Sequence, residues 1–276
     1  MATSISSKPP VVLVTGCSLG GIGYALCEAF AARGCTVYAT SRRLESITSL
    51  THPSIHCLEM DVTSDSSVKQ CVEQIVHEAG RVDIAIANAG VPCFGPVLDI
   101  PIEDAKVHKR LGCSPTSTGC ISTYGVPQAR NFHDCSVSSN LFVPWAGLYC
   151  ASKAAVGSLT EALQMEARAL SPDIRVTLVM AATVRSKFSS NSKFQIPENS
   201  LFKSCAHGIK SVTEIAMGDS VMPPSQFANN LDHAALRKQG PPQKISYGSF
   251  AIHFWVLRWL PVWLAHWVLW KLYGEK

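Results

Sequence analysis

The stretch VVLVTGCSLGGIGYALCEAFAARG, residues 11–34, decides the fold. Its first four residues form a short apolar run that is typical of a buried strand. A turn that contains Gly16, Gly21 and Gly23 follows, and residues 24–33 have the apolar spacing of a helix that ends at Gly34. This order predicts a binding site for dinucleotide phosphates, because backbone N–H groups and the helix dipole can approach an anion there. The alternative is an ordinary glycine-rich turn.

The same alternation of strand and helix continues along the chain. Apolar runs predict strands at residues 36–40, 56–60, 82–87 and 174–180. Helical spacing of apolar residues predicts helices at 64–80 and 152–170. Strands that are joined by single helices favour right-handed crossovers. We therefore expect an α/β fold with a doubly wound parallel sheet, whose ligand lies beyond the carboxyl ends of the strands.

Length and composition limit the function classes. The 276 residues suffice for one α/β domain, and 47% apolar with 16% charged residues is typical of a globular protein. The net charge of +4 is scattered along the chain, which argues against a nucleic-acid partner. The 11 cysteines include no Cys-x-x-Cys pair, so we expect free thiols, no metal site and a reducing, cytoplasmic compartment. Residues 1–10 are polar and predicted to be disordered.

The C-terminal segment is unusually aromatic. Residues 252–273 read IHFWVLRWLPVWLAHWVLWKLY, and Arg258, Pro261 and His266 interrupt the apolar sequence. This pattern favours a segment that lies on a membrane surface, such as the cytoplasmic face of the endoplasmic reticulum or a lipid droplet. The alternative is a C-terminal helix that packs on the protein core or on the partner in a homodimer.

Two other regions lack clear periodicity. Residues 106–136 are polar and contain Pro115 and Pro127, so we predict irregular structure there. Residues 191–250 are rich in Ser, Pro and Asn, and we predict a loop-rich cover over a small-molecule site. The expected organisation is therefore a disordered segment at 1–10, a nucleotide-binding domain at 11–190, a substrate cover at 191–250 and an aromatic segment at 251–276.

The residues after the second predicted strand bear on the choice of nucleotide. A carboxylate at this place bonds the adenosine ribose of NAD, whereas an arginine accommodates the 2′-phosphate of NADP. The sequence has Ser41, Arg42 and Arg43 here and no acid before Glu45. Guanidinium groups form charge-assisted hydrogen bonds with phosphate, so this pattern favours NADP. The alternative is a solvated basic loop.

Tyr149 and Lys153 form a candidate catalytic pair. Residues four apart share one face of a helix, and these two begin the helix that we predict. An ammonium beside a phenol favours the phenolate, which makes the pair suited to proton transfer. The alternative is a surface pair with no chemical role.

Together these segments resemble the short-chain dehydrogenase/reductases over about residues 10–190. The matching segments are TGCSLGGIG at 15–23, Asp61-Val62, Ala87-Asn88-Ala89-Gly90 and Tyr149-x₃-Lys153. The glycine turn is one residue longer than the common form. This length, the stretch PWAGLYCASKAAV and the Trp-rich tail are similar to the fungal branch around 1-acyldihydroxyacetone-phosphate reductase.

The resemblance implies a Rossmann-type fold, NADP as cofactor and reduction of a carbonyl substrate that is lipid-like or belongs to secondary metabolism. Tyr149 would protonate the carbonyl oxygen, Lys153 would support Tyr149, and Ser136, with Ser138 as the alternative, would polarise the carbonyl group. Ala181-Ala182 replaces the family's Pro-Gly. The residues that the resemblance implies to contact the cofactor are Gly16, Ser18, Gly21, Ile22, Gly23, Arg42, Arg43, Asp61, Asn88, Tyr149, Lys153, Val184 and Ser186.

One departure from the family concerns residues 90–136, where the family has a long helix with an active-site Asn and then a central strand. We expect the polar sequence to supply neither element. A catalytically silent binding protein at a membrane surface is therefore an alternative function. An epimerase or dehydratase is a third, since those enzymes also use a Tyr-x₃-Lys pair.

Overall fold

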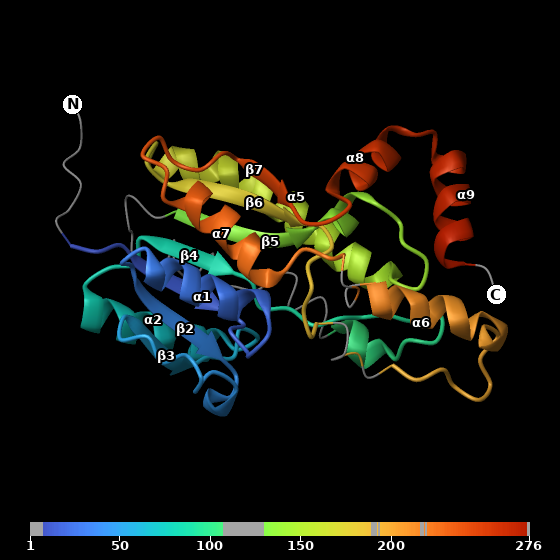
Figure 1. The fold of residues 1–276 in the computed structure, drawn as a ribbon, viewed down its shortest axis with the longest axis horizontal. Coiled ribbons are helices and arrows are strands. Elements are labelled where there is room, and N and C mark those ends of the chain that lie inside the picture. The colour runs from blue at the N-terminus through green and yellow to red at the C-terminus, as the bar shows by residue number, and fades with distance from the viewer. Residues whose placement is uncertain are drawn as a thin grey trace.

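The computed structural model describes residues 8–106, 130–188, 192, 194–215, 218 and 220–274. Seven parallel strands form one sheet in the order β3-β2-β1-β4-β5-β6-β7 (Figure 1). The strands are β1 Val11–Thr15, β2 Thr36–Ser41, β3 Ile55–Glu59, β4 Ile84–Ala87, β5 Arg130–Ser136, β6 Arg175–Ala181 and β7 Lys244–Tyr247. The predicted doubly wound parallel sheet is confirmed.

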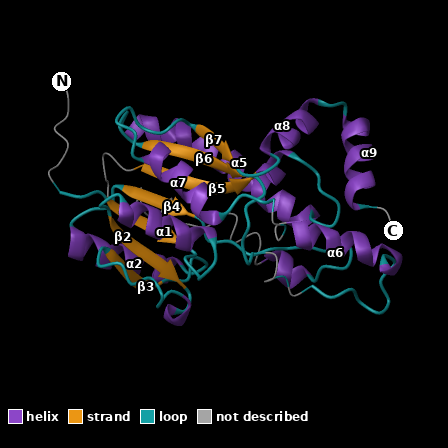
Figure 2. Cartoon of the chain, in the orientation of Figure 1, coloured by secondary structure: helices purple, strands orange, loops and turns teal. Residues whose placement is uncertain are grey.

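Helices cover both faces of this sheet (Figure 2). Helices α1 (Ile22–Ala32) and α7 (Pro224–Ala235) pack against each other on one face, where Phe30 and Phe227 are fully buried. Helix α2 (Asp65–Ala79) covers β1 and β4 on the other face, and α5 (Gly147–Leu170) covers β5 and β6 there. The predicted helix at 64–80 is confirmed closely, because Ser64 accepts a hydrogen bond from the Ser67 N–H and Gly80 ends α2 with φ +79°.

The central strand β5 corrects the expectation that residues 106–136 are irregular throughout. Residues 130–136 pair in parallel with β4 on one side and β6 on the other. The strand could not be recognised from its sequence, because one of its faces has the polar residues Asn131 and His133 where a buried strand usually has apolar ones. Both residues are nonetheless buried. The His133 Nδ1 atom is 2.8 Å from Thr160 Oγ1 of α5, and burial lowers the pKa of His133 to about 4, so the ring is neutral. The remainder of the predicted irregular region, 107–129, lies outside the described residues.

The region 191–250 is only partly the loop-rich cover that we predicted. Helix α7 packs on α1 in the core of the fold, and β7 extends the sheet beside β6. Helix α6 (Ala206–Glu214) and its preceding turn lie beyond the carboxyl ends of the strands (Figure 1). Sequence composition concealed α7 and β7, because α7 is mostly polar on its outer face and β7 has only four residues.

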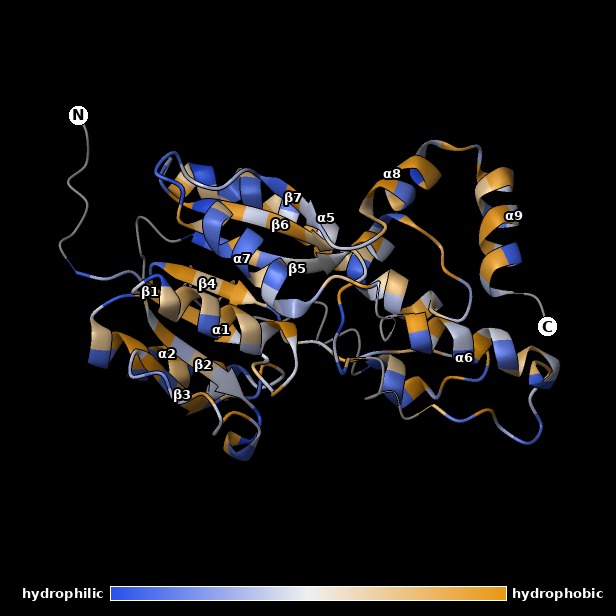
Figure 3. Ribbon diagram, in the orientation of Figure 1, coloured by the Kyte–Doolittle hydropathy of each residue, from blue (hydrophilic) through white to orange (hydrophobic). Residues whose placement is uncertain are grey.

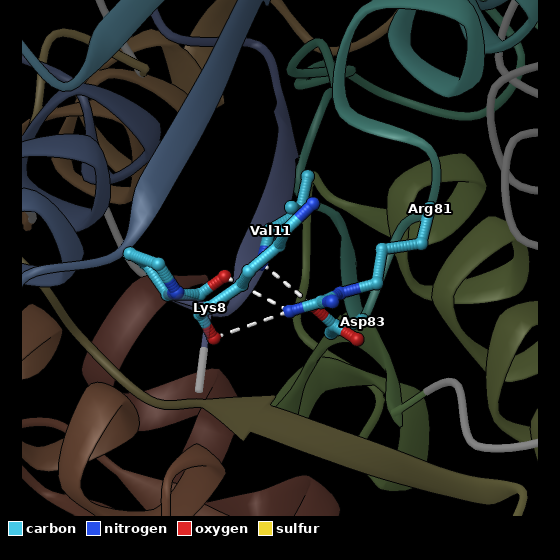
Figure 4. A network of polar contacts seen from close by, with 5 residues as sticks. Lys8, Val11, Arg81 and Asp83 are labelled. Atoms are coloured by element: carbon cyan, nitrogen blue, oxygen red, sulfur yellow. Dashed lines mark hydrogen bonds and ion pairs between the residues drawn. The ribbon is translucent and has the colours of Figure 1, made fainter. Parts of the chain in front are cut away.

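The amino-terminal edge of the sheet is fixed by a polar network (Figure 4). The Asp83 carboxylate accepts hydrogen bonds from the Val11 N–H and from Arg81 Nε, both at 2.8 Å. Arg81 also donates to the carbonyl groups of Lys8 and Pro9. These bonds hold the start of β1 beside the start of β4. The rest of the N-terminal segment that we predicted to be disordered, residues 1–7, lies outside the described residues.

The aromatic C-terminal segment forms two helices, whereas the packing alternative considered above was a single helix. Helix α8 (Ala251–Trp259) ends at Leu260, and α9 (Val262–Tyr273) begins after Pro261. Both helices contain many hydrophobic residues, which are orange in Figure 3. Within the described residues, no helix combines the length and the apolar character that crossing a bilayer requires.

Candidate active site

A cavity of about 1310 Å³ opens at the carboxyl ends of the strands. Residues at or just beyond the ends of five strands line it, and they are Gly16, Ser41, Asn88, Ser136 and Ala181. Parallel strands bring such residues to one edge of the sheet. The sequence-predicted ligand site therefore coincides with a real cavity.

The glycine turn forms one wall of this cavity, and two of its glycines leave no room for a side chain. Gly16 has φ +72°, and a Cβ atom there would lie 2.8 Å from the Ala89 Cα atom. A Cβ atom on Gly23 would lie 2.5 Å from the Gly16 carbonyl oxygen and 2.6 Å from Asn88 Nδ2. Gly16, Ser18, Gly21 and Ile22 line the cavity, whereas Gly23 lies behind them and permits close packing of the turn.

Asn88 connects the end of β4 to the glycine turn. Its Nδ2 atom donates to the carbonyl oxygens of Thr15, at 2.7 Å, and Gly16, at 3.1 Å. The backbone N–H groups of Asn88 and Ala89 both donate to Thr15 Oγ1. The Asn88 side chain lines the cavity, and its described hydrogen bonds give it a role in shaping the turn.

Basic and hydroxyl side chains gather at the end of β2. Arg42 and Arg43 both line the cavity, and neither guanidinium forms an ion pair with a carboxylate in the described ranges. Ser41 Oγ is 2.7 Å from Ser46 Oγ, which also accepts a hydrogen bond from Ser18 Oγ at 3.3 Å. Ser46 was not predicted from the sequence, because it lies in a short 3₁₀ turn with no motif.

Asp61 lies outside the cavity, although its neighbours Met60 and Val62 line it. The Asp61 carboxylate accepts hydrogen bonds from the Thr63 N–H at 2.9 Å and from Thr63 Oγ1 at 2.8 Å. The Thr63 N–H is the largest cause that holds the pKa of Asp61 below its usual value, and the Arg42 charge adds to it. Asp61 is thus ionised and orders the turn after β3.

The candidate catalytic side chains come together in this cavity. Ser136, Tyr149 and Lys153 all line it. The Lys153 Nζ atom lies 5.8 Å from the centroid of the Tyr149 ring. The Tyr149 ring also packs against Phe94 and Phe188, with ring centroids 6.0 and 5.7 Å apart.

Ser138, the alternative to Ser136, lines the same cavity, and its N–H donates to Ser136 Oγ at 3.2 Å. Ser136 is the last residue of β5. The central strand, which we did not predict from the sequence, therefore positions this hydroxyl group in the site.

The segment after β6 closes the cavity. Val184 and Ser186 line it, as do Lys187 and Phe188, which sequence reasoning did not select. Where the sequence has Ala181-Ala182, the Ala182 N–H donates to the Tyr247 carbonyl oxygen at 2.8 Å, so β7 supports the turn. No cluster of metal-ligating side chains occurs within the described residues.

Comparison with known proteins decides the family. The sequence model for short chain dehydrogenases matches residues 10–196. This chain belongs to the short-chain dehydrogenase/reductase family. It is therefore an NAD(P)-dependent oxidoreductase that acts on a small molecule, which confirms the resemblance and the enzyme class expected from the motifs.

Individual relatives of this short-chain dehydrogenase/reductase extend the comparison. The chain is 32% identical over 278 residues to the short-chain dehydrogenase ptmH of Penicillium ochrochloron, with 95% of this chain and 97% of the relative covered. It is 35% identical over 212 residues to the NADPH-dependent 1-acyldihydroxyacetone phosphate reductase of Schizosaccharomyces pombe, with 69% and 67% covered. The crystal structure of a short-chain dehydrogenase from Streptomyces avermitilis shares the fold, with a TM-score of 0.80, 23% identity and 98% of each chain covered.

Proposed function

We propose that this enzyme uses NADPH to reduce a ketone or aldehyde to an alcohol, and that its substrate is a lipid-like or secondary-metabolite carbonyl compound. The observation that carries the proposal is that Ser136, Tyr149 and Lys153 line the same cavity as the glycine turn. One cavity can then hold the nucleotide and the carbonyl group side by side.

Several features of the cavity support a phosphorylated dinucleotide as the cofactor. The turn of Gly16 and Gly21 leaves room for phosphate oxygens, and α1 directs its amino-terminal end toward them. Arg42 and Arg43 would hold the 2′-phosphate, since two guanidinium groups that form no ion pair among the described residues favour an anion in the cavity beside them. The S. pombe relative, which is NADPH-dependent by name, supports this choice.

The chemistry divides between the nucleotide and three side chains. When bound, NADPH supplies a hydride for the carbonyl carbon. The Tyr149 hydroxyl donates its proton to the carbonyl oxygen, and the Ser136 hydroxyl polarises that oxygen by donating a hydrogen bond. The Lys153 ammonium lies close enough to the Tyr149 ring to stabilise the phenolate that remains. Solvent then returns the proton to Tyr149.

Replacing both arginines with alanine (Arg42→Ala, Arg43→Ala) tests the cofactor. Loss of charge-assisted hydrogen bonds should raise the Kd for NADPH by about 10- to 100-fold. The Kd for NADH should change little, because NADH has no 2′-phosphate. Fluorescence titration of each nucleotide measures both constants.

The matched control replaces Arg237 and Lys238 with alanine, because these adjacent basic residues are exposed and do not line the cavity. It should bind NADPH like the wild type. Equal loss of NADPH and NADH affinity in the Arg42/Arg43 variant would contradict a 2′-phosphate site.

The apolar part of the cavity supports a lipid-like substrate. Phe94, Phe188 and Phe194 line it near Tyr149, and Phe254 of α8 and Tyr273 of α9 complete this wall. The Trp145 Nε1 atom donates to the Tyr273 carbonyl oxygen at 2.7 Å, which joins the end of α9 to the loop before Tyr149. The two C-terminal helices are thus part of the substrate wall.

We propose in addition that α8 and α9 contact a membrane surface that contains anionic lipid. Trp259 and Trp263 are 72% and 71% exposed, and Trp255, Trp267 and Trp270 are exposed beside them. Indole rings favour the interface between lipid and water. Arg258 and Lys271 are the formally charged residues of 251–274, which include no acid, so their charge complements an anionic surface.

Replacement of Trp259 and Trp263 with serine should reduce binding to vesicles of phosphatidylcholine and phosphatidylserine by at least about tenfold, since each ring loses its burial in the interface. Flotation of protein with vesicles measures this. The control replaces Leu98 and Leu201, two exposed leucines outside α8 and α9, with serine. Unchanged flotation of the Trp variant would contradict the proposed surface.

Wild-type protein that floats but has no saturable NADPH binding would favour a silent binding protein instead of an enzyme.

A further inference from the structure

The Lys187 side chain lies beside Gly20 of the glycine turn. A Cβ atom on Gly20 would meet the Lys187 side chain at Cε, Cδ and Cγ, at 3.3, 3.5 and 3.7 Å. Gly20 has φ +81° and directly precedes Gly21, the residue that caps the amino-terminal end of α1. The Lys187 ammonium is one bond beyond Cε and therefore lies near the turn.

The described cations that line the cavity come from separate segments of the chain. The described cations that line it are Arg42, Arg43, Lys153 and Lys187. Arg42 and Arg43 follow β2 and Lys153 belongs to the candidate catalytic pair, whereas the Lys187 side chain lies beside Gly20 of the glycine turn. An anion bound against the turn would face α1 on one side and Lys187 on the other.

We infer that Lys187 binds the pyrophosphate of the nucleotide and holds it against the glycine turn. This inference rests on the cofactor site of the proposed function, but it concerns a different phosphate from the one assigned to Arg42 and Arg43. Backbone N–H groups of the turn and the Lys187 ammonium would both donate hydrogen bonds to the pyrophosphate oxygens.

The residue after Lys187 connects this segment to the candidate catalytic tyrosine. Phe188 packs against the Tyr149 ring, and its Cε2 atom is 3.9 Å from a Cβ position on Gly90. Consecutive residues of one segment thus contact the phosphate-binding turn and the candidate proton donor. Binding of the pyrophosphate by Lys187 fixes the segment that supports the Tyr149 ring.

The test compares Lys187→Met with wild type for two ligands, NADPH and adenosine 2′-monophosphate, which has the 2′-phosphate but no pyrophosphate. Methionine keeps an unbranched apolar chain beside Gly20 and removes the charge. The Kd for NADPH should rise by about tenfold or more, whereas that for adenosine 2′-monophosphate should stay within about twofold. Lys187→Arg should restore most of the NADPH affinity, because it restores the charge.

Lys244→Met is the matched control, since Lys244 is an exposed lysine at the opposite end of the strands. It should bind both ligands normally. Equal weakening of both ligands by Lys187→Met, or no weakening of NADPH, would overturn the assignment while the proposed function stands. Wild-type protein without saturable NADPH binding would overturn both.

Discussion

Tyr149→Phe should lower kcat/KM for carbonyl reduction by about 10²- to 10⁴-fold, the usual contribution of a positioned general acid. The substitution removes one hydroxyl group and keeps the ring, whose packing against Phe94 and Phe188 then stays intact. The Kd for NADPH should therefore remain close to that of the wild type. Loss of NADPH absorbance with a long-chain methyl ketone measures turnover, and fluorescence titration measures binding.

Tyr247→Phe provides the control for this experiment. Tyr247 lies in β7, packs against Phe227 and does not line the cavity. It loses the same hydroxyl group, so its kcat/KM should match that of the wild type. Normal turnover by Tyr149→Phe would refute the assignment of Tyr149 as the proton donor.

Phe132→Ala should lower the free energy of unfolding by about 3–5 kcal/mol, because it removes a large side chain from the centre of the core. Phe132 is 0% exposed on the central strand and packs in the core beneath α1 and α7. A typical domain has only about 5–15 kcal/mol of stability, so the variant should unfold at much lower urea concentration. Urea unfolding followed by circular dichroism measures this.

Phe142→Ala is the matched control, since the Phe142 side chain is 68% exposed. Its free energy of unfolding should change by about 0.5 kcal/mol or less. Equal stability of the two variants would mean that β5 does not occupy the middle of the sheet, and Ser136 would then lose its place in the site.

Much of the fold was predictable because its signals are local. The apolar run of β1, the glycine turn and the spacing of α1 are contiguous in the sequence, and Ser64 and Gly80 mark the ends of α2. The central strand was not predictable in this way. Asn131 and His133 are buried by neighbouring elements, and His133 bonds to Thr160, which is 27 residues away. A pattern of polar residues cannot reveal a partner at that distance.

The same difference between local motifs and long-range contacts decides which site residues could be predicted from the sequence. Glycines, the two arginines and the Tyr-x₃-Lys spacing are motifs, so sequence reasoning selected residues that line one cavity. Asp61 and Gly23 were selected too, yet they shape the walls from outside it. Ser46 and Lys187 were missed because only the folded chain brings them to the turn.

Pro261 lies between α8 and α9 and prevents them from forming one continuous helix. An unbroken helix over residues 251–273 would be about 34 Å long, enough to traverse the hydrocarbon layer of about 30 Å. Leu260 instead adopts an extended backbone, with ψ 150°, and the chain changes direction before Val262. A proline cannot donate the N–H that a continuous helix needs at this place. Pro261 thus divides a segment that is long enough to cross a bilayer into two helices that are each too short to do so.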